Sequence, residues 1–170
     1  MEVLYLGNGS IRIRSKLANF VVNPRASLAK TEADAIISFE EDVDTSKITE
    51  FRLIIAGPGE YEIKGVKISG TKSDAGIVYR LSLDKMDIVL SKASAISKGE
   101  NISSHIVVVD ADEVPSDKIL TAMEPNVVIL YGEKAKEGAK TIKEGSAEPV
   151  NKYAVTFEKL PQEMEVITLG

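Results

Sequence analysis

Short apolar runs separated by turn-forming residues fill the first half of the chain. Runs of this kind, bounded by Gly, Pro or Asn, are typical of strands. The strongest turn is Gly7-Asn8-Gly9, because Asn-Gly tolerates the positive φ angles of a tight hairpin. The pattern predicts strands at residues 3–6, 11–13, 20–22, 35–37, 52–56, 61–63, 66–68, 76–83 and 86–90.

The second half has a different pattern. His105 opens the apolar run 106–109, which is typical of a strand buried on both faces in a parallel sheet. A helix is predicted between Pro115, which suits a first turn, and Pro125, which stops it. Because another apolar strand follows, this segment predicts a β-α-β unit in a layered α/β protein with mixed sheets. The remaining predicted elements are a strand at 127–130, a helix at 135–143 and strands at 153–157 and 164–169.

The composition is that of one globular domain spanning residues 1–170, with 44% hydrophobic residues. The 26 Asp and Glu outnumber the 21 Lys and Arg, so we expect no nucleic-acid partner, which would need a clustered basic surface. The chain has no Cys, and its sequence holds no apolar run near the roughly 18 residues of a membrane span. We therefore expect a cytoplasmic protein without a membrane partner.

Three segments resemble the metallo-β-lactamase superfamily. Residues 4–10, Leu-Tyr-Leu-Gly-Asn-Gly-Ser, followed by Val-Asn-Pro at 22–24, are similar to the W-L-G-H-S and I-D-P signatures of its lactonase-like branch. Residues 57–66 resemble a G-P-G-E-Y-E-V-x-G-V hairpin of small members, and residues 160–166 resemble that branch's tail. The resemblance implies a four-layered αββα sandwich, an α/β (α+β) fold with two mixed β-sheets and few helices.

The metal-binding motif of that family has no counterpart here. Active members carry S-H-x-H-x-D-H, whose side chains hold metal ions that activate a water molecule. Residues 38–44 read Ser-Phe-Glu-Glu-Asp-Val-Asp instead. The resemblance puts the following residues at the former metal-pocket positions: Asn8, Phe39, Glu41, Val43, Asp44, Ser73, Asp74, Lys92 and, at the last histidine, Leu130 or Tyr131.

Lys92 stands at the position of the family's bridging aspartate, where a cation would repel a metal ion. We predict that its ammonium lies within about 4 Å of a carboxylate of Glu41, Asp44 or Asp74. Such an ion pair would be a structural substitute for zinc.

Two other candidate sites have weaker patterns. His105 is the sole histidine and opens a buried strand, so we expect a packing or hydrogen-bonding role and no metal ligation. The acidic run at 40–44 is typical of a solvated loop. An all-oxygen Mg²⁺ or Ca²⁺ site built from that run and Asp74 is the alternative.

These departures favour a non-catalytic family member that binds a protein or small molecule or serves in assembly, without a catalytic residue, metal ion or cofactor. The resemblance also implies a homo-oligomer. The alternative is a hydrolase of altered chemistry, with either an oxygen-ligand metal site or a metal-free site of Lys92 with Ser91 or Ser94.

Overall fold

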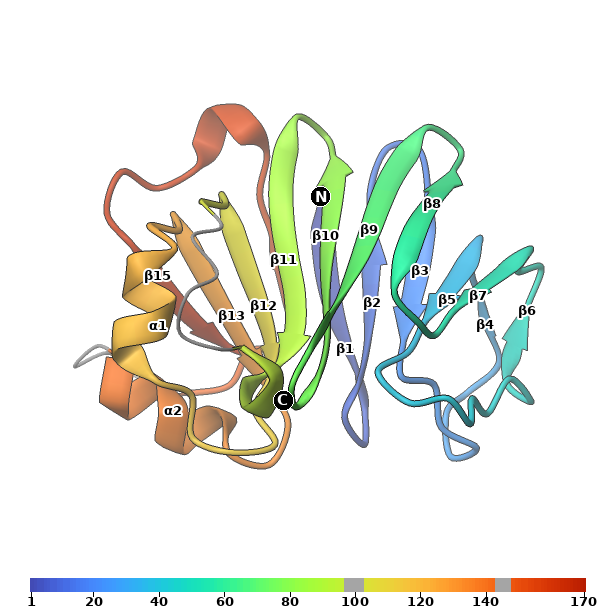
Figure 1. Ribbon diagram of the computed structural model, residues 1–170, viewed down its shortest axis with the longest axis horizontal. Helices are drawn as coiled ribbons and strands as arrows, with labels where there is room; N and C mark the ends of the chain where they lie inside the picture. The colour runs from blue at the N-terminus through green and yellow to red at the C-terminus, as the bar shows by residue number, and fades with distance from the viewer. Residues whose placement is uncertain (97–102, 143–147) are drawn as a thin grey trace.

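The computed structural model describes residues 1–96, 103–142 and 148–170. Most of its elements are strands, arranged in two large sheets and one small sheet (Figure 1). The six-stranded sheet has the order β14-β1-β2-β3-β5-β7. Its strands are β1 (Glu2–Gly7), β2 (Ser10–Arg14), β3 (Asn19–Val22), β5 (Ala35–Ile37), β7 (Leu53–Ile55) and β14 (Lys152–Ala154).

The seven-stranded sheet has the order β15-β13-β12-β11-β10-β9-β8. Strands β8 to β11 are antiparallel to one another, whereas β11, β12, β13 and β15 run parallel. The predicted β-α-β unit is confirmed, because α1 (Asp117–Ala122) connects β12 to β13. The strands are β8 (Gly59–Ile63), β9 (Val66–Ser73), β10 (Gly76–Leu83), β11 (Met86–Lys92), β12 (Ile106–Asp110), β13 (Val127–Tyr131) and β15 (Glu165–Thr168).

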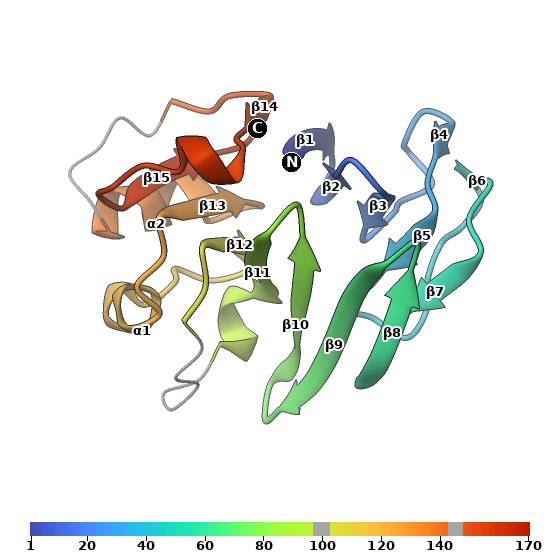
Figure 2. The same cartoon turned by 90° about the horizontal axis from the view of Figure 1, so that it is seen from above.

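The two large sheets pack face to face around one apolar core (Figure 2). Ile11 and Phe20 of the six-stranded sheet meet Val108 of the seven-stranded sheet in this core, and all three are fully buried. Val107 and Val109 point to the opposite face, where they join a second apolar cluster. The run 106–109 is therefore buried on both faces, as its sequence predicted.

Helices cover the outer face of the seven-stranded sheet. Leu120 of α1 and Ala139 of α2 (Ala135–Ile142) belong to the second apolar cluster there. Over the outer face of the six-stranded sheet, Val21 and Ile36 are covered by loops and by the small sheet of β4 (Thr31–Glu32) and β6 (Ile48–Thr49). The expected helical layer on that side is not seen in the described part of the chain, because the covering segments carry apolar residues singly and not at helical spacing.

Most predicted elements are present, with shifts at their ends. Asn8 and Gly9 have φ angles of 51° and 74°, which confirms the tight hairpin between β1 and β2. The strand predicted at 153–157 stops at Ala154, because its partner β1 begins at Glu2, directly opposite. A 3-10 helix, η2 (Phe157–Lys159), follows. Residue 143 of the predicted second helix lies outside the described residues, and none of the described helices has the length and apolarity to cross a membrane.

Candidate functional site

The parallel strands β11, β12 and β13 end in register at one edge of the seven-stranded sheet. Lys92 pairs with Asp110, and Asp110 pairs with Tyr131, so the three side chains lie on one face of the sheet. Leu90 and Val108, two residues earlier on that face, belong to the core between the sheets. The strand ends therefore place three polar groups at the rim of an apolar interface.

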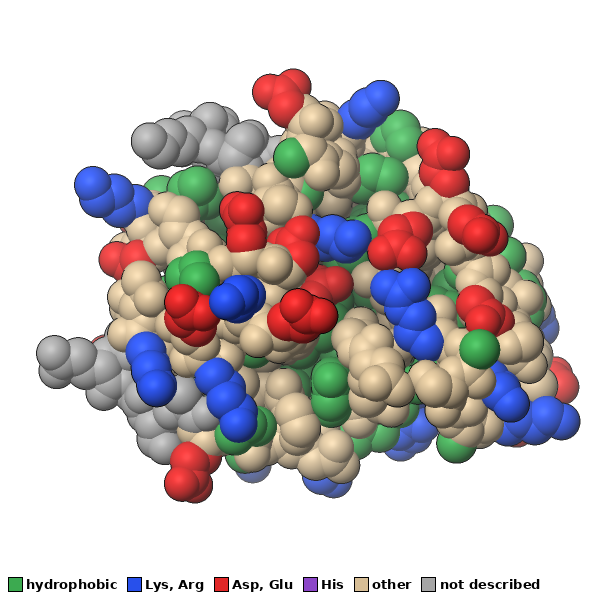
Figure 3. All heavy atoms as spheres, turned by 90° about the horizontal axis from the view of Figure 1, so that it is seen from below, with side chains coloured by type: hydrophobic (Ala, Val, Ile, Leu, Met, Phe, Trp, Pro, Cys, Tyr) green, Lys and Arg blue, Asp and Glu red, His purple; other side chains and the backbone are tan. Residues whose placement is uncertain are grey.

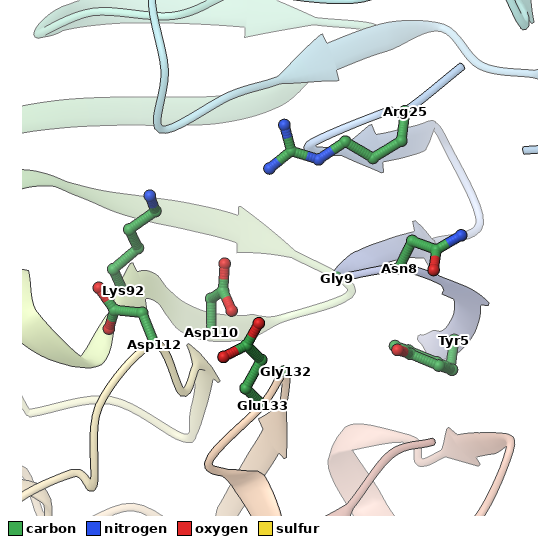
Figure 4. Close-up of a pocket in the computed structure, with 9 residues that line it drawn as sticks. All are labelled: Tyr5, Asn8, Gly9, Arg25, Lys92, Asp110, Asp112, Gly132 and Glu133. Carbon is green, nitrogen blue, oxygen red and sulfur yellow. The ribbon is translucent and has the colours of Figure 1, made fainter. Parts of the chain in front are cut away.

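A pocket of about 660 Å³ opens over these strand ends (Figure 4). Its volume lies within the roughly 300–1,000 Å³ of small-molecule sites. The first hairpin and the loop after β3 also line it, so segments distant in sequence meet here. Its polar lining consists of Tyr5, Asn8, Arg25, Lys92, Asp110, Asp112 and Glu133.

Arg25, Glu40 and Lys92 form a chain of ion pairs at this pocket. Arg25 donates two hydrogen bonds to Glu40, of 3.1 and 3.3 Å, and Lys92 Nζ lies 3.4 Å from Glu40 Oε1. The hydrogen bonds from Arg25 hold the pKa of Glu40 below its ordinary value and raise the pKa of Arg25. Acidic and basic side chains alternate across this side of the molecule (Figure 3).

The predicted partner of Lys92 is wrong. We expected Glu41, Asp44 or Asp74, whereas the ion pair in the structure is with Glu40. Arg25 explains the difference, because it holds the neighbouring carboxylate of Glu40 at the pocket. The motif alignment names no role for this arginine.

The structure does not bring the former metal-pocket positions together: six of the residues line two separate pockets, whereas Val43 and Asp44 line neither. The pocket over the strand ends holds Asn8 and Lys92. Val43 packs in the apolar cluster on the outer face, and Asp44 accepts a 2.9 Å hydrogen bond from the backbone of Ser46. A second pocket, of about 300 Å³ beside the turn at 57–58, is lined by residues that include Phe39, Glu41, Ser73 and Asp74.

Asp110 is a carboxyl group with a strongly shifted pKa. Burial raises its pKa to about 6, and the positive charge of Lys92 opposes that rise. Asn23 Nδ2 donates only a long hydrogen bond of 3.5 Å to it. Gly132 packs so closely that an added Cβ would stand 2.6 Å from Asp110 Oδ1, and its φ of +96° also favours glycine.

Tyr131, one of the two residues that the resemblance puts at the last-histidine position, is fully buried. Its hydroxyl has no hydrogen-bond partner in the described structure. Burial raises the pKa of this hydroxyl, and the negative charges of Asp110 and Asp112 raise it further. Leaving a buried hydroxyl unpaired costs about 1–3 kcal/mol, so its position beside two carboxylates needs an explanation.

Asp112 and Glu133 complete the acidic lining. Asp112 accepts hydrogen bonds from the hydroxyl and backbone N–H of Ser94, at 2.6 and 3.1 Å. These bonds hold the 3-10 turn η1 (Ala93–Ala95) that follows β11. Glu133 is exposed and follows Gly132 directly.

The residues around the pocket do not fit a zinc ion. In residues 1–96, 103–142 and 148–170, no three His, Asp or Glu side chains form a group that could hold a metal. His105 lies at the other end of β12, where its Nδ1 accepts a 3.0 Å hydrogen bond from the backbone N–H of Asp87. Arg25 and Lys92, which both line the pocket, have no acceptor atom and cannot be metal ligands.

Sequence reasoning missed Arg25, Asp110, Asp112 and Glu133. A usable signal exists for two of them, because Asp110 ends a buried parallel strand and Glu133 follows the end of the next one. Side chains at the carboxyl ends of parallel strands are frequent ligand contacts. Arg25 and Asp112 have no such signal, since they come from loops whose course depends on the whole fold.

The comparisons with known proteins show the fold. No family model matches the chain, and no curated protein matches it. A candidate Zn-dependent hydrolase of the metallo-β-lactamase superfamily from Thermotoga maritima matches with a TM-score of 0.78 at 17% identity, covering 99% of this chain and 98% of that chain. The chain has a metallo-β-lactamase-like fold.

Two further solved structures are more distant. CmlA, a diiron β-hydroxylase from Streptomyces venezuelae, matches with a TM-score of 0.53 at 10% identity, over 84% of this chain and 47% of that chain. A diphosphatase of the PhnP family matches with a TM-score of 0.50 at 10% identity, over 71% and 70% of the two chains. These likenesses concern the fold alone.

Proposed function

We infer that this protein is a non-catalytic member of the metallo-β-lactamase superfamily, from its lactonase-like branch, that binds a small molecule without a metal ion. The ligand site is the pocket over the ends of β11, β12 and β13. The single observation that carries the proposal is the chain of ion pairs from Arg25 through Glu40 to Lys92. Lys92, which the family resemblance puts at a metal-ligand position, belongs to this chain of ion pairs.

Electrostatics supports this interpretation. A divalent cation gains its binding energy from several converging carboxylates or imidazoles. Here the carboxylate of Glu40 is already paired with Arg25 and Lys92. The family resemblance puts Lys92 at the position of a bridging ligand. Fold similarity by itself does not transfer the hydrolase activity of a neighbour.

A metal-free hydrolase is the second candidate, favoured by Asp110. A carboxyl group with a pKa of about 6 is suited to acid–base chemistry near neutral pH. The version with a Ser–Lys pair is less favoured, because the hydroxyl of Ser91 donates to the backbone carbonyl of Lys92 and the hydroxyl of Ser94 donates to Asp112. A hydrolase would therefore depend on Asp110.

Elemental analysis of the purified protein, with thermal shifts against Zn²⁺, Mn²⁺, Mg²⁺ and Ca²⁺, tests the proposal. We expect no stoichiometric metal and no saturable stabilisation. Stoichiometric metal would overturn the proposal. Hydrolysis of phosphodiester, lactone or thioester substrates that is lost in Asp110→Asn and kept in Asp74→Asn would establish the second candidate instead.

A further inference from the structure

The basic side chains at the pocket form ion pairs, whereas three of its acidic side chains do not within the part of the chain that the structure describes. Arg25 and Lys92 share the carboxylate of Glu40, so this group of three has one positive charge in excess. Asp110, Asp112 and Glu133 make no ion pair with any residue that the structure describes. The acidic side therefore carries more uncompensated charge than the basic side.

The carboxylates also differ in how well neutral donors satisfy them. Asp112 accepts hydrogen bonds from Ser94 and from the backbone of Glu113. Asp110 accepts the long 3.5 Å hydrogen bond from Asn23. No residue in the described part of the chain donates a hydrogen bond to the carboxylate of Glu133. In Figure 4 the carboxylates of Asp110 and Glu133 both point into the pocket.

Tyr131 provides an independent observation at the same place. Its hydroxyl is fully buried, has no partner in the described part of the chain, and lies close enough to Asp110 for that charge to affect it. Side-chain register puts Tyr131 beside Asp110 on one face of the sheet. The end of β13 thus places an unpaired, buried hydroxyl beside Asp110, a poorly paired carboxyl group that lines the pocket.

We propose that this pocket binds a small organic cation through an aliphatic ammonium group held by Asp110 and Glu133 and hydrogen-bonded to Tyr131. The inference rests on the proposed binding function and names its ligand class. An ammonium has three N–H donors and no acceptor, which matches two carboxylates and one hydroxyl oxygen. Charge-assisted bonds of this kind are stronger than neutral ones.

An anion and a metal ion both fit less well. An anion would have to compete with Glu40 for Arg25 and Lys92, and would then face the three carboxylates on the other side. A metal ion needs ligand oxygens that converge, and no group of three or more converges in the described residues. Both oxygens of Asp112 are already engaged by Ser94.

The test is isothermal titration calorimetry of the full chain at pH 8 and low salt with butylamine, 1,4-diaminobutane, butyrate and MgCl₂. We expect saturable one-site binding of both amines, and neither butyrate nor MgCl₂ should bind. Asp110→Asn and Glu133→Gln should each weaken amine binding about tenfold or more, the ratio expected for one charge-assisted hydrogen bond. Glu41→Gln, which removes a carboxylate from the second pocket, is the matched control and should leave binding unchanged.

Tyr131→Phe distinguishes a role of the hydroxyl in amine binding from a role in the stability of the fold. It removes an unpaired buried hydroxyl, so the melting temperature should not fall, while amine affinity should. Absence of saturable amine binding, binding of butyrate instead, or equal weakening by Glu41→Gln would overturn the inference. If stoichiometric metal is absent and amines still fail to bind, only the ligand class is wrong, whereas stoichiometric metal removes the proposed function itself.

Discussion

The two ends of the parallel strands β11, β12 and β13 differ in how their titratable side chains are hydrogen-bonded. At the amino ends, the backbone N–H of His105 donates to Asp87 and the N–H of Asp87 donates back to the imidazole, at 2.9 and 3.0 Å. Asn126 donates its side-chain amide to Pro161, at 2.9 Å. Ser104 Oγ is an unpaired buried atom there.

At the carboxyl ends, a carboxyl group and a phenol hydroxyl lack an ion pair or a short hydrogen bond among the described residues. Asp110 is half-buried without an ion pair in the described structure, and the hydroxyl of Tyr131 is unpaired. Buried polar groups are normally satisfied, and the exceptions concentrate at functional sites, where binding supplies the missing partner. The contrast supports the proposal that the ligand site lies at the end with Asp110.

The largest expected effect on stability is at Gly132, where the backbone packs closely against Asp110. Gly132→Ala should lower the free energy of unfolding by about 2–4 kcal/mol, because its Cβ would meet Asp110 Oδ1 and its φ is positive. Urea denaturation measures this loss. Gly9→Ala is the matched control, since its φ is also positive but nothing lies within 4 Å. An equal loss in both variants would mean that the contact with Asp110 contributes nothing.

Asp110→Asn should stabilise the protein in a pH-dependent way. Burial raises the pKa of Asp110 from its ordinary 3.8 to about 6, so the folded protein holds this proton more tightly than the unfolded chain. Its favourable contribution is complete below about pH 4 and is lost as the pH rises through about 6. The variant, which cannot ionise, should exceed the wild type by about 1–3 kcal/mol at pH 8, with no such gain at pH 4.

Urea denaturation of both proteins at pH 4, 6 and 8 checks this prediction. Asp74→Asn serves as the control, because this carboxylate is exposed in the second pocket. A constant difference across the three pH values would show that the effect of Asp110 does not come from its ionisation.

The sequence predicts the fold much better than the site. Period-two runs and the tight Gly-Asn-Gly turn fix the strands locally, and the motif resemblance supplies the topology. Pairing at the pocket depends on loops that meet only after folding. Lys92 lines the pocket, but its ion-pair partner, Glu40, is not one of the three acids that the resemblance predicted. The unpaired hydroxyl of Tyr131 is a property of three-dimensional packing that no sequence pattern records.

Lys92→Met has a smaller expected effect on stability. The ion pair with Glu40 is partly open to water, with side-chain exposures of 27% and 40%, so its loss should cost about 0–1 kcal/mol. Lys134→Met, which breaks the exposed pair with Glu137, is the control. Lys92→Met should also raise the pKa of Asp110 further, because the lysine charge lowers it. The pH at which ionisation of Asp110 lowers the free energy of unfolding should therefore be higher in Lys92→Met than in the wild type. Lys134→Met should leave that pH unchanged.

A small effect on stability, and none on amine binding, is expected at the amino end of the strands. His105→Gln removes the imidazole that accepts from Asp87 and lies edge-on to Phe157 at 5.5 Å, but a glutamine oxygen can still accept that hydrogen bond. We expect a loss of about 0.5–1 kcal/mol in urea denaturation and unchanged amine binding at the opposite strand ends. A folded variant that no longer binds amines would contradict the division of roles, because it would couple a group at the structural end to the pocket at the other.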